Sequence, residues 1–291
     1  RSLLTRFTAD LPLLLQADRL HTPIDTEARR KMAVKLIATD LDGTLMAPDH
    51  MTVAERTKNA LLAAHNKGIK IAIATGRTLT FTDSVTVQIP FVDYVVSSNG
   101  AAVYDRNAKK YVYSTLVPNK VVLEAVELLN SLPVHYHIYL GGRIYIQNSA
   151  LNYAADTGLP EEFLKDFISR VTVCEDMKEV IGDSDVEVID IFSMGENETE
   201  IVEFMKKNNL VMTSAVRGEL AATAVGADKG TALDGLCGVL GITSDEVMTF
   251  GDAENDCPML EFAGLSFAME NGNDICKKSA KAVVSFRGKI I

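Results

Sequence analysis

The stretch IATDLDGTL, residues 37–45, places Asp40 and Asp42 directly after an apolar run and directly before Gly-Thr. Carboxylates at a strand end add nothing to a hydrophobic core, because a buried charge is costly unless it is paired. The overlapping VKLIAT, residues 34–39, is typical of a strand buried inside a parallel sheet. The stretch therefore predicts a buried strand that ends in a chemical site.

Strands and helices alternate after this stretch. Thr52 with Glu55 three residues later indicates a capping box, and we expect a helix from Thr52 to Gly68. IKIAIAT (69–75) and DYVVSSNG (93–100) are further buried strands, with a helical segment between them through the eighties. This order predicts a parallel sheet with crossover helices.

The middle of the chain follows another pattern. VHYHIYLGGRIYI, residues 134–146, consists of two alternating runs around Gly141-Gly142 and predicts an antiparallel hairpin. We therefore expect an α/β fold: a doubly wound, mostly parallel Rossmann-like core with an inserted α+β cap domain. The expected boundaries are 33–116 and 223–291 for the core and 117–222 for the cap. Residues 1–32 are expected to be an N-terminal extension with little role in chemistry.

Composition excludes several classes of protein. The chain has 291 residues and a formal net charge of −10, with a pI of about 5.1, which disfavours nucleic-acid binding. Its apolar stretches are too short to cross a bilayer. Four cysteines without a CxxC pair indicate reduced thiols of a cytoplasmic protein. We expect no nucleic-acid or membrane partner, and a monomer or homodimer.

Acids, small-residue turns and a lysine recur where the other core strands end. Open α/β sheets bind ligands at this carboxyl edge. Asp40, Asp42 and Asp252 offer three hard oxygen donors, which suit Mg²⁺ rather than zinc. With Lys229 at the start of a helix, the set fits phosphoryl transfer through an aspartyl-phosphate. Thr75 and nearby backbone N–H groups can hold the other phosphate oxygens.

Four motifs resemble those of the haloacid dehalogenase superfamily of phosphatases: DLDGT at 40–44, TGR at 75–77, DKG at 228–230 and GDAENDCPML at 251–260. The large insert between the second and third motifs, with SSNGAAVYD and AMENGND, resembles the Cof-type branch, which carries an α/β cap. The resemblance covers roughly residues 33–285. It is specific because all four motifs occur in order and at suitable separations.

The resemblance implies a role for each matched residue. Asp40 is the expected nucleophile, Asp42 the general acid/base that lends its backbone carbonyl to Mg²⁺, and Lys229 the group that neutralises charge. The expected substrate-binding residues are Thr75, Gly76, Arg77 and Asn255, and the expected metal site consists of Asp40, Asp42, Asp252 and Asp256. Asn99 and Asn271 also fall where this branch often has asparagines near the site.

These roles describe a Mg²⁺-dependent phosphatase that hydrolyses small phosphorylated metabolites. Candidate substrates are sugar phosphates and phosphorylated cofactors such as pyridoxal phosphate or flavin mononucleotide. A phosphomutase on the same core and a non-catalytic metabolite-binding regulator are the alternatives. Asp256 can also cap the helix that follows it. His135 and His137 alternate with apolar residues, a pattern more typical of packing in the cap than of a metal or substrate site.

Overall fold

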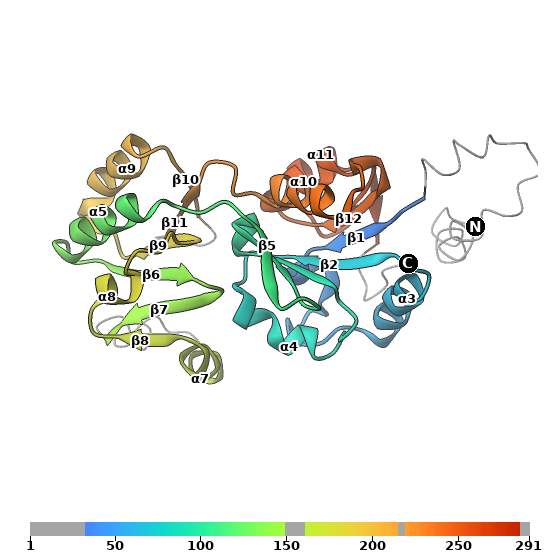
Figure 1. Ribbon diagram of the computed structural model, residues 1–291, viewed down its shortest axis with the longest axis horizontal. Helices are drawn as coiled ribbons and strands as arrows, with labels where there is room; N and C mark the ends of the chain where they lie inside the picture. Colours follow the sequence, from blue (N-terminus) through green and yellow to red (C-terminus); the bar gives the residue numbers. More distant parts are fainter. Residues whose placement is uncertain (1–32, 149–160, 215–218, 286–291) are drawn as a thin grey trace, which may run out of the picture.

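The computed structural model describes residues 33–148, 161–214 and 219–285. The predicted N-terminal extension, residues 1–32, lies outside the described residues. The described chain forms two units that lie side by side, each built on one sheet (Figure 1). No helix within these described ranges is long and apolar enough to cross a membrane.

The first unit contains an eight-stranded sheet. In spatial order its strands are β14 (Ala282–Val284), β13 (Leu265–Met269), β12 (Val247–Gly251), β1 (Leu36–Thr39), β2 (Lys70–Ala74), β3 (Tyr94–Ser97), β4 (Ala102–Asp105) and β5 (Lys110–Ser114). The six strands from β14 to β3 pair in parallel, whereas β4 and β5 add an antiparallel hairpin. The predicted mostly parallel α/β sheet is confirmed.

Helices cover both faces of this sheet (Figure 1). One face carries α3 (Glu55–His65) and α4 (Asp83–Thr86), and the other carries α10 (Lys229–Leu240) and α11 (Cys257–Phe262), with α12 (Asp274–Ser279) packed against α11. Alternation along β1 explains the arrangement, since Ile37 packs with Leu61 of α3 while Leu36 packs with Leu233 of α10. The doubly wound architecture is therefore confirmed.

Two helix predictions were wrong in their extent. The helix expected from Thr52 begins at Glu55, with Ala54 as its N-cap. The backbone N–H and hydroxyl of Thr52 instead donate to the carboxylate of Asp49, because an aspartate turn offers these donors a local partner. The helix expected through the eighties is reduced to a short turn, Leu79–Thr82, followed by α4.

The second unit contains a six-stranded sheet. Its spatial order is β10 (Leu210–Thr213), β11 (Glu219–Ala224), β9 (Val188–Phe192), β6 (His135–Leu140), β7 (Arg143–Gln147) and β8 (Thr172–Cys174), antiparallel except for β7 with β8. The hairpin expected around Gly141-Gly142 is confirmed as β6–β7. The expected boundary between residues 222 and 223 falls inside β11, and the exact domain limits stay a prediction.

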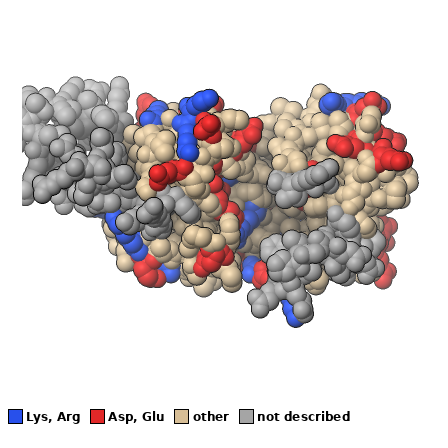
Figure 2. Space-filling model, turned by 180° about the vertical axis from the view of Figure 1, so that it is seen from behind, with Lys and Arg blue, Asp and Glu red and all other residues tan. Residues whose placement is uncertain are grey.

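The second unit corresponds to the expected cap, and the two faces of its six-stranded sheet pack against different partners. Tyr136 and Ile138 pack under the helices α5 (Asn119–Asn130), α8 (Met177–Ile181) and α9 (Glu198–Lys207). His137 and Tyr139, which alternate with these residues along β6, belong to the opposite face of the sheet. On that face His137 packs against Phe167 of α7 (Glu161–Arg170). Phe81 of the core unit packs in the same cluster as Tyr139, so this face adjoins the core. Figure 2 shows the surface hollowed between the two units, with charged side chains beside the hollow.

Candidate active site

The predicted site residues follow neighbouring parallel strands at one edge of the core sheet. Asp40 follows β1, Thr75 follows β2, Asn99 lies in the turn after β3 and Asp252 follows β12. These four strands are adjacent in the order β12-β1-β2-β3 and run in the same direction. Their carboxyl ends therefore gather the residues into one place, as expected for an open α/β sheet.

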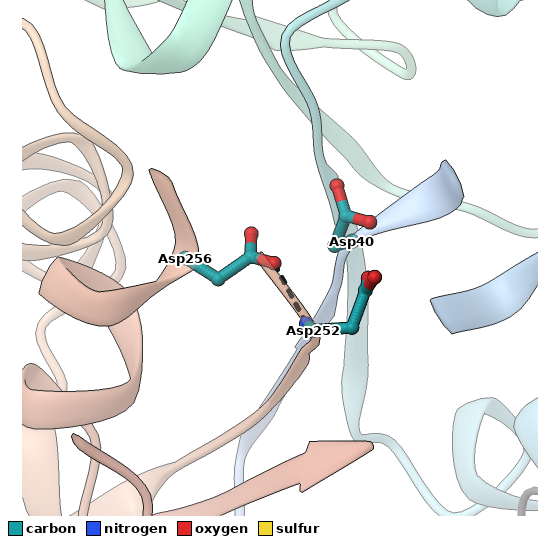
Figure 3. A group of neighbouring side chains, drawn as sticks. All are labelled: Asp40, Asp252 and Asp256. Atoms are coloured by element: carbon teal, nitrogen blue, oxygen red, sulfur yellow. Dashed lines mark hydrogen bonds between the residues drawn. The ribbon is translucent and has the colours of Figure 1, made fainter. Parts of the chain in front are cut away.

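Three carboxylates form the centre of this site. Asp40, Asp252 and Asp256 each offer an oxygen, and these atoms all lie within 4.8 Å of one another. In Figure 3 the carboxylates of Asp40 and Asp252 lie side by side, and Asp256 approaches them from the turn before α11. Asp40 and Asp256 are buried, so their mutual repulsion is only weakly screened by water.

Lys229 compensates part of this negative charge. Its side chain is 0% exposed, and its Nζ donates to Asp40 Oδ1 at 2.8 Å and to Asp256 Oδ1 at 2.6 Å. Burial alone would lower the pKa of Lys229, but the charges of Asp40 and Asp256 outweigh it and raise the pKa, so the lysine stays protonated. Asp228 starts the helix α10 by accepting from the backbone of Thr231, which fixes the position of the lysine.

Asp256 is held by hydrogen bonds on both oxygens. While Oδ1 accepts from Lys229, Oδ2 accepts from the backbone N–H groups of Asp252 at 2.8 Å and Ala253 at 2.9 Å. Asp256 thus closes the turn before α11. It stands at the N-cap position of α11, but its side chain makes no capping hydrogen bond to that helix, so the expected helix cap is not found. It is near enough to be a metal ligand, but its partners favour a role in supporting Lys229 and the turn.

Asp252 is oriented by the DLDGT motif. Its Oδ1 accepts from the hydroxyl of Thr44 at 2.6 Å, and its Oδ2 lies 3.4 Å from the side-chain nitrogen of Asn271. Gly43 has a φ of +88°, and a Cβ at this position would collide with the carboxylate of Asp252. Glycine is therefore required both for the left-handed turn and for the close approach.

The donor set fits a hard divalent cation. Burial raises the pKa of Asp40, Lys229 opposes this rise, and the charges of Asp256 and Asp252 add to it. Burial also raises the pKa of Asp252. One lysine cannot neutralise three clustered carboxylates, whereas a divalent cation would stabilise their ionised forms. Oxygen donors of this kind are those that Mg²⁺ prefers.

Asp42 lies in a different environment from Asp40. Its carboxylate accepts from Arg77 Nε at 2.8 Å and from the second guanidinium nitrogen of Arg77, and His50 Nδ1 is 3.2 Å away. Burial pushes the pKa of Asp42 upward, but hydrogen bonds and charge from Arg77 and His50 outweigh it and lower the pKa. Its side chain stands outside the group of three carboxylates, and the expected metal contact through its backbone carbonyl stays a prediction.

The predicted substrate-binding residues are only partly together. Thr75 accepts from the backbone N–H of Arg77 through its hydroxyl, and a Cβ at Gly76 would lie only 3.1 Å from Asn99 Oδ1. Asn99 Oδ1 in turn accepts from Asn255 Nδ2 at 2.9 Å. The Arg77 side chain is turned to Asp42, so its expected contact with substrate stays a prediction.

Sequence reasoning missed three contributors. Thr44 belongs to the quoted DLDGT motif, and its role could have been expected from that motif. His50 and Ser98 gave no such signal, because their partners are Asp42, eight residues away, and a glutamate 89 residues away. Contacts of this kind depend on how loops fold over the site rather than on local spacing.

Comparison with known proteins agrees with this geometry. Residues 37–287 match the family of haloacid dehalogenase-like hydrolases. The chain belongs to this family. A relative from Bacillus subtilis (strain 168), the 5-amino-6-(5-phospho-D-ribitylamino)uracil phosphatase YcsE, is 28% identical over 254 residues, which is 87% of this chain and 90% of the relative.

Two solved structures of haloacid dehalogenase-type proteins are similar over nearly their whole length. A haloacid dehalogenase-like hydrolase from B. subtilis has a TM-score of 0.70 and 27% identity, covering 87% of this chain and 95% of its own. The subclass IIB sugar phosphatase BT4131 has a TM-score of 0.68 and 25% identity, covering 87% and 94%. These likenesses support the Cof-type assignment, the Rossmann-like core with a cap, and the class of phosphoric monoester hydrolases.

Proposed function

We propose that this protein is a Mg²⁺-dependent phosphatase that hydrolyses a small phosphorylated metabolite through an aspartyl-phosphate at Asp40. The observation that carries the proposal is the buried contact of Asp40 with Lys229, beside Asp252 and Asp256. Asp40 Oδ1 accepts from Lys229, and its second oxygen has no hydrogen-bond partner among the described residues. That oxygen is available for attack on phosphorus.

In the first step, Asp40 attacks phosphorus and the bond to the leaving oxygen breaks. Lys229 favours the ionised form of Asp40 against the effect of burial, and it offsets the charge that develops on the transferring group. Asp40 and Asp252 would hold Mg²⁺, with Asp256 supporting them, and the bound ion would supply further compensation of phosphate charge. Thr75 and the N–H groups near Gly76 would bind the remaining phosphate oxygens.

Asp42 is the proposed acid and base. The leaving oxygen takes a proton from its carboxyl group; the carboxylate then takes a proton from the water that attacks the phosphoryl group, and phosphate is released. The ion pair with Arg77 favours the carboxylate, which is the form needed to activate water. We therefore propose that the contact with Arg77 loosens when substrate binds, so that Asp42 can carry the proton for the first step.

The face of the cap sheet that adjoins the core is the proposed recognition surface for the leaving group. It carries His137, Tyr139 and Asp190, and the hydroxyl of Tyr139 donates to Asp190 Oδ2 at 2.8 Å. Burial raises the pKa of Asp190 to about 8 and lowers the pKa of His137 to about 4. At neutral pH the side chains of His137 and Asp190 are therefore uncharged donors and acceptors, which suit a polyol or a heterocycle.

The test is phosphate release from a panel of esters. It contains sugar phosphates, nucleotides, pyridoxal phosphate, flavin mononucleotide, p-nitrophenyl phosphate and, from the names of relatives, 5-amino-6-(5-phospho-D-ribitylamino)uracil. Each ester is assayed with Mg²⁺ or EDTA, for the wild type and for Asp40→Asn. We expect release that requires Mg²⁺ and is lost in Asp40→Asn.

Other outcomes would reject parts of the proposal. Release that persists in Asp40→Asn would exclude Asp40 as the nucleophile, and release in EDTA would exclude the dependence on Mg²⁺. Phosphoryl transfer to a second position of the substrate without release would indicate the phosphomutase. Ligand binding without turnover of any ester would indicate the non-catalytic regulator. Cytoplasmic location and a monomeric or homodimeric state also remain proposals.

A further inference from the structure

A buried glutamate of the cap contacts the core beside the active site. Glu187 lies directly before β9 and is 3% exposed. Its Oε2 accepts from the hydroxyl of Ser98 in the core at 2.7 Å, and its Oε1 accepts from the backbone N–H of Gly142 in the β6–β7 turn at 2.8 Å. One carboxylate therefore links the core to two parts of the cap.

The core partner of Glu187 belongs to a backbone segment in an unfavourable conformation. Ser98, Asn99 and Gly100 have φ angles of +51°, +56° and +100°. Residues with a Cβ rarely adopt the left-handed region, and such a conformation persists only where surrounding contacts hold it. The side chain of Ser98 is fully buried, and its contact with Glu187 is one of those that hold the segment.

The same segment contacts three motifs of the active site. The N–H of Ser98 donates to the carbonyl of Arg77 at 2.9 Å, and the N–H of Asn99 donates to the carbonyl of Thr75 at 3.0 Å. The Asn99 side chain also accepts from Asn255. Gly100 packs directly on the peptide between Asp228 and Lys229, where a Cβ would collide with the backbone. Movement of residues 98–100 would therefore reach the expected substrate-binding residues Thr75, Arg77 and Asn255 and the backbone at Lys229.

The other partner of Glu187 fastens the cap to the core. The carbonyl of Gly142 accepts from both the N–H and the hydroxyl of Thr80 at 3.0 Å. A side chain at Gly142 would collide with Leu79 and Tyr111 of the core, so the turn fits closely against it. The Glu187 contact with Gly142 is thus present when the β6–β7 turn is seated on the core.

A purely structural role explains Glu187 poorly. Burial of a carboxylate is costly, and Glu187 is satisfied by two neutral donors without an ion pair to any lysine or arginine in the described ranges. A neutral side chain could fill the same space at lower cost. A carboxylate does offer two acceptor oxygens at once, one for the cap turn and one for the core segment.

We propose that Glu187 is a positioning residue that couples the seating of the cap to the conformation of residues 98–100, and thereby to Asn99 at the active site. The inference rests on the proposed phosphatase function of that site. Seating of the β6–β7 turn orients Glu187, Glu187 holds Ser98, and Ser98 fixes the backbone that places Asn99 against Thr75 and Asn255. Hydrolysis is thereby favoured when the cap is closed over the substrate.

The kinetic test is a double-mutant cycle on full-length protein. We expect Glu187→Ala to lower kcat by about 10- to 30-fold while KM changes by less than about threefold, since Glu187 acts on the reacting geometry rather than on substrate binding. In an Asn99→Ala background, the same substitution should lower kcat by less than about twofold, because its route to the site is already removed. Glu187→Gln keeps one acceptor oxygen and should recover part of the loss.

The second readout does not need turnover. Amide hydrogen exchange at Ser98 and Asn99 should accelerate in Glu187→Ala, in addition to exchange at Gly142, which loses its acceptor directly. Glu203→Ala is the matched control, because Glu203 is an exposed glutamate in the middle of α9. Neither kcat nor exchange at these amides should change in the control.

Two results would overturn the inference. One is a loss of kcat from Glu187→Ala that is equally large with and without Asn99. The other is faster exchange at Gly142 with unchanged exchange at Ser98 and Asn99, which would show that Glu187 only supports the cap. If the wild type hydrolyses no ester, the proposed function fails by itself, and the exchange measurement then decides whether the coupling exists.

Discussion

Two groups of buried acids, one in the core and one in the cap, differ in the partners that compensate their charge. In the core, Lys229 contacts both Asp40 and Asp256. In the cap, Asp190 accepts from the neutral hydroxyl of Tyr139, and burial, with the nearby charge of Glu219, raises its pKa to about 8. Burial raises the pKa of Asp40 to about 8 as well, but within the described residues only the core group has a lysine that opposes this rise by pairing with the carboxylate. The difference shows that burial alone does not make a nucleophile.

The largest effect should come from removal of that cation. Lys229→Met leaves Asp40 and Asp256 buried without their partner, so we expect a loss of about 3–5 kcal/mol in the free energy of unfolding. The transferring group also loses charge compensation, so kcat should fall by about 100- to 1000-fold. Urea denaturation without Mg²⁺ and steady-state kinetics measure the two effects.

Lys278→Met is the control for this prediction. Lys278 is an exposed lysine of α12, and its substitution should change stability by less than about 0.5 kcal/mol. Stability of Lys229→Met equal to that of the wild type would contradict the account of the core group, since it would mean that the carboxylates tolerate each other without the lysine.

The second prediction concerns the pH dependence that Asp190 gives to stability. Its pKa is raised in the folded state from 3.8 to about 8, so between these values the folded protein binds more protons than the unfolded chain. The free energy of unfolding must therefore fall as pH rises through this window. Asp190→Asn removes the ionisation and should flatten the profile between about pH 5 and about pH 8 by up to about 4 kcal/mol.

Urea denaturation across that range checks the prediction. Asp183→Asn serves as the control, because Asp183 is an exposed aspartate of the same unit and should leave the profile unchanged. Parallel profiles for the wild type and Asp190→Asn would show that Asp190 is already ionised in the folded protein, and the contrast between the two acidic groups would disappear.

The third prediction is that Mg²⁺ stabilises the protein through the acidic group of the core and not through that of the cap. The ion binds the folded core and should stabilise the wild type by about 2.7 kcal/mol at a concentration about 100 times its dissociation constant. Asp252→Asn should remove this stabilisation, whereas Asp190→Asn should keep it, because Asp190 is a residue of the cap. Equal stabilisation of all three proteins would place the cation elsewhere.

The smallest effect is expected from Tyr139→Phe. It removes the hydroxyl that donates to Asp190 and should cost about 0.5–1.5 kcal/mol, the usual contribution of one hydrogen bond. Stabilisation by Mg²⁺ is the internal reference and should remain as in the wild type. A loss of Mg²⁺ stabilisation in this variant would show that the cap surface and the core group are not independent.

The core was predictable from sequence because its signals are local. Asp40, Thr75 and Asp252 each follow a buried apolar strand, and parallel strands bring their carboxyl ends to one edge. A cation beside the acids was also foreseeable, since clustered carboxylates require one. Lys229 is such a cation. The start of α3 was not foreseeable, because Thr52 had a nearer partner in Asp49 than in the helix backbone.

Contacts between the cap and the core could not be predicted from the sequence. Glu187 precedes a strand as many exposed acids do, and nothing in its neighbours indicates burial. Its contact with Ser98 depends on how the cap rests on the core. The pairing of Arg77 with Asp42 likewise joins two motifs that were expected to meet the substrate separately.

The most direct test of the central claim is chemical trapping of the phosphorylated aspartate. A single turnover with the best ester is quenched, borohydride reduces the acyl phosphate, and mass spectrometry of peptides locates the reduced residue. The account predicts reduction at Asp40, and none in Asp40→Asn or in protein without substrate. Reduction at Asp42 or Asp252, or turnover without any reduced aspartate, would contradict it.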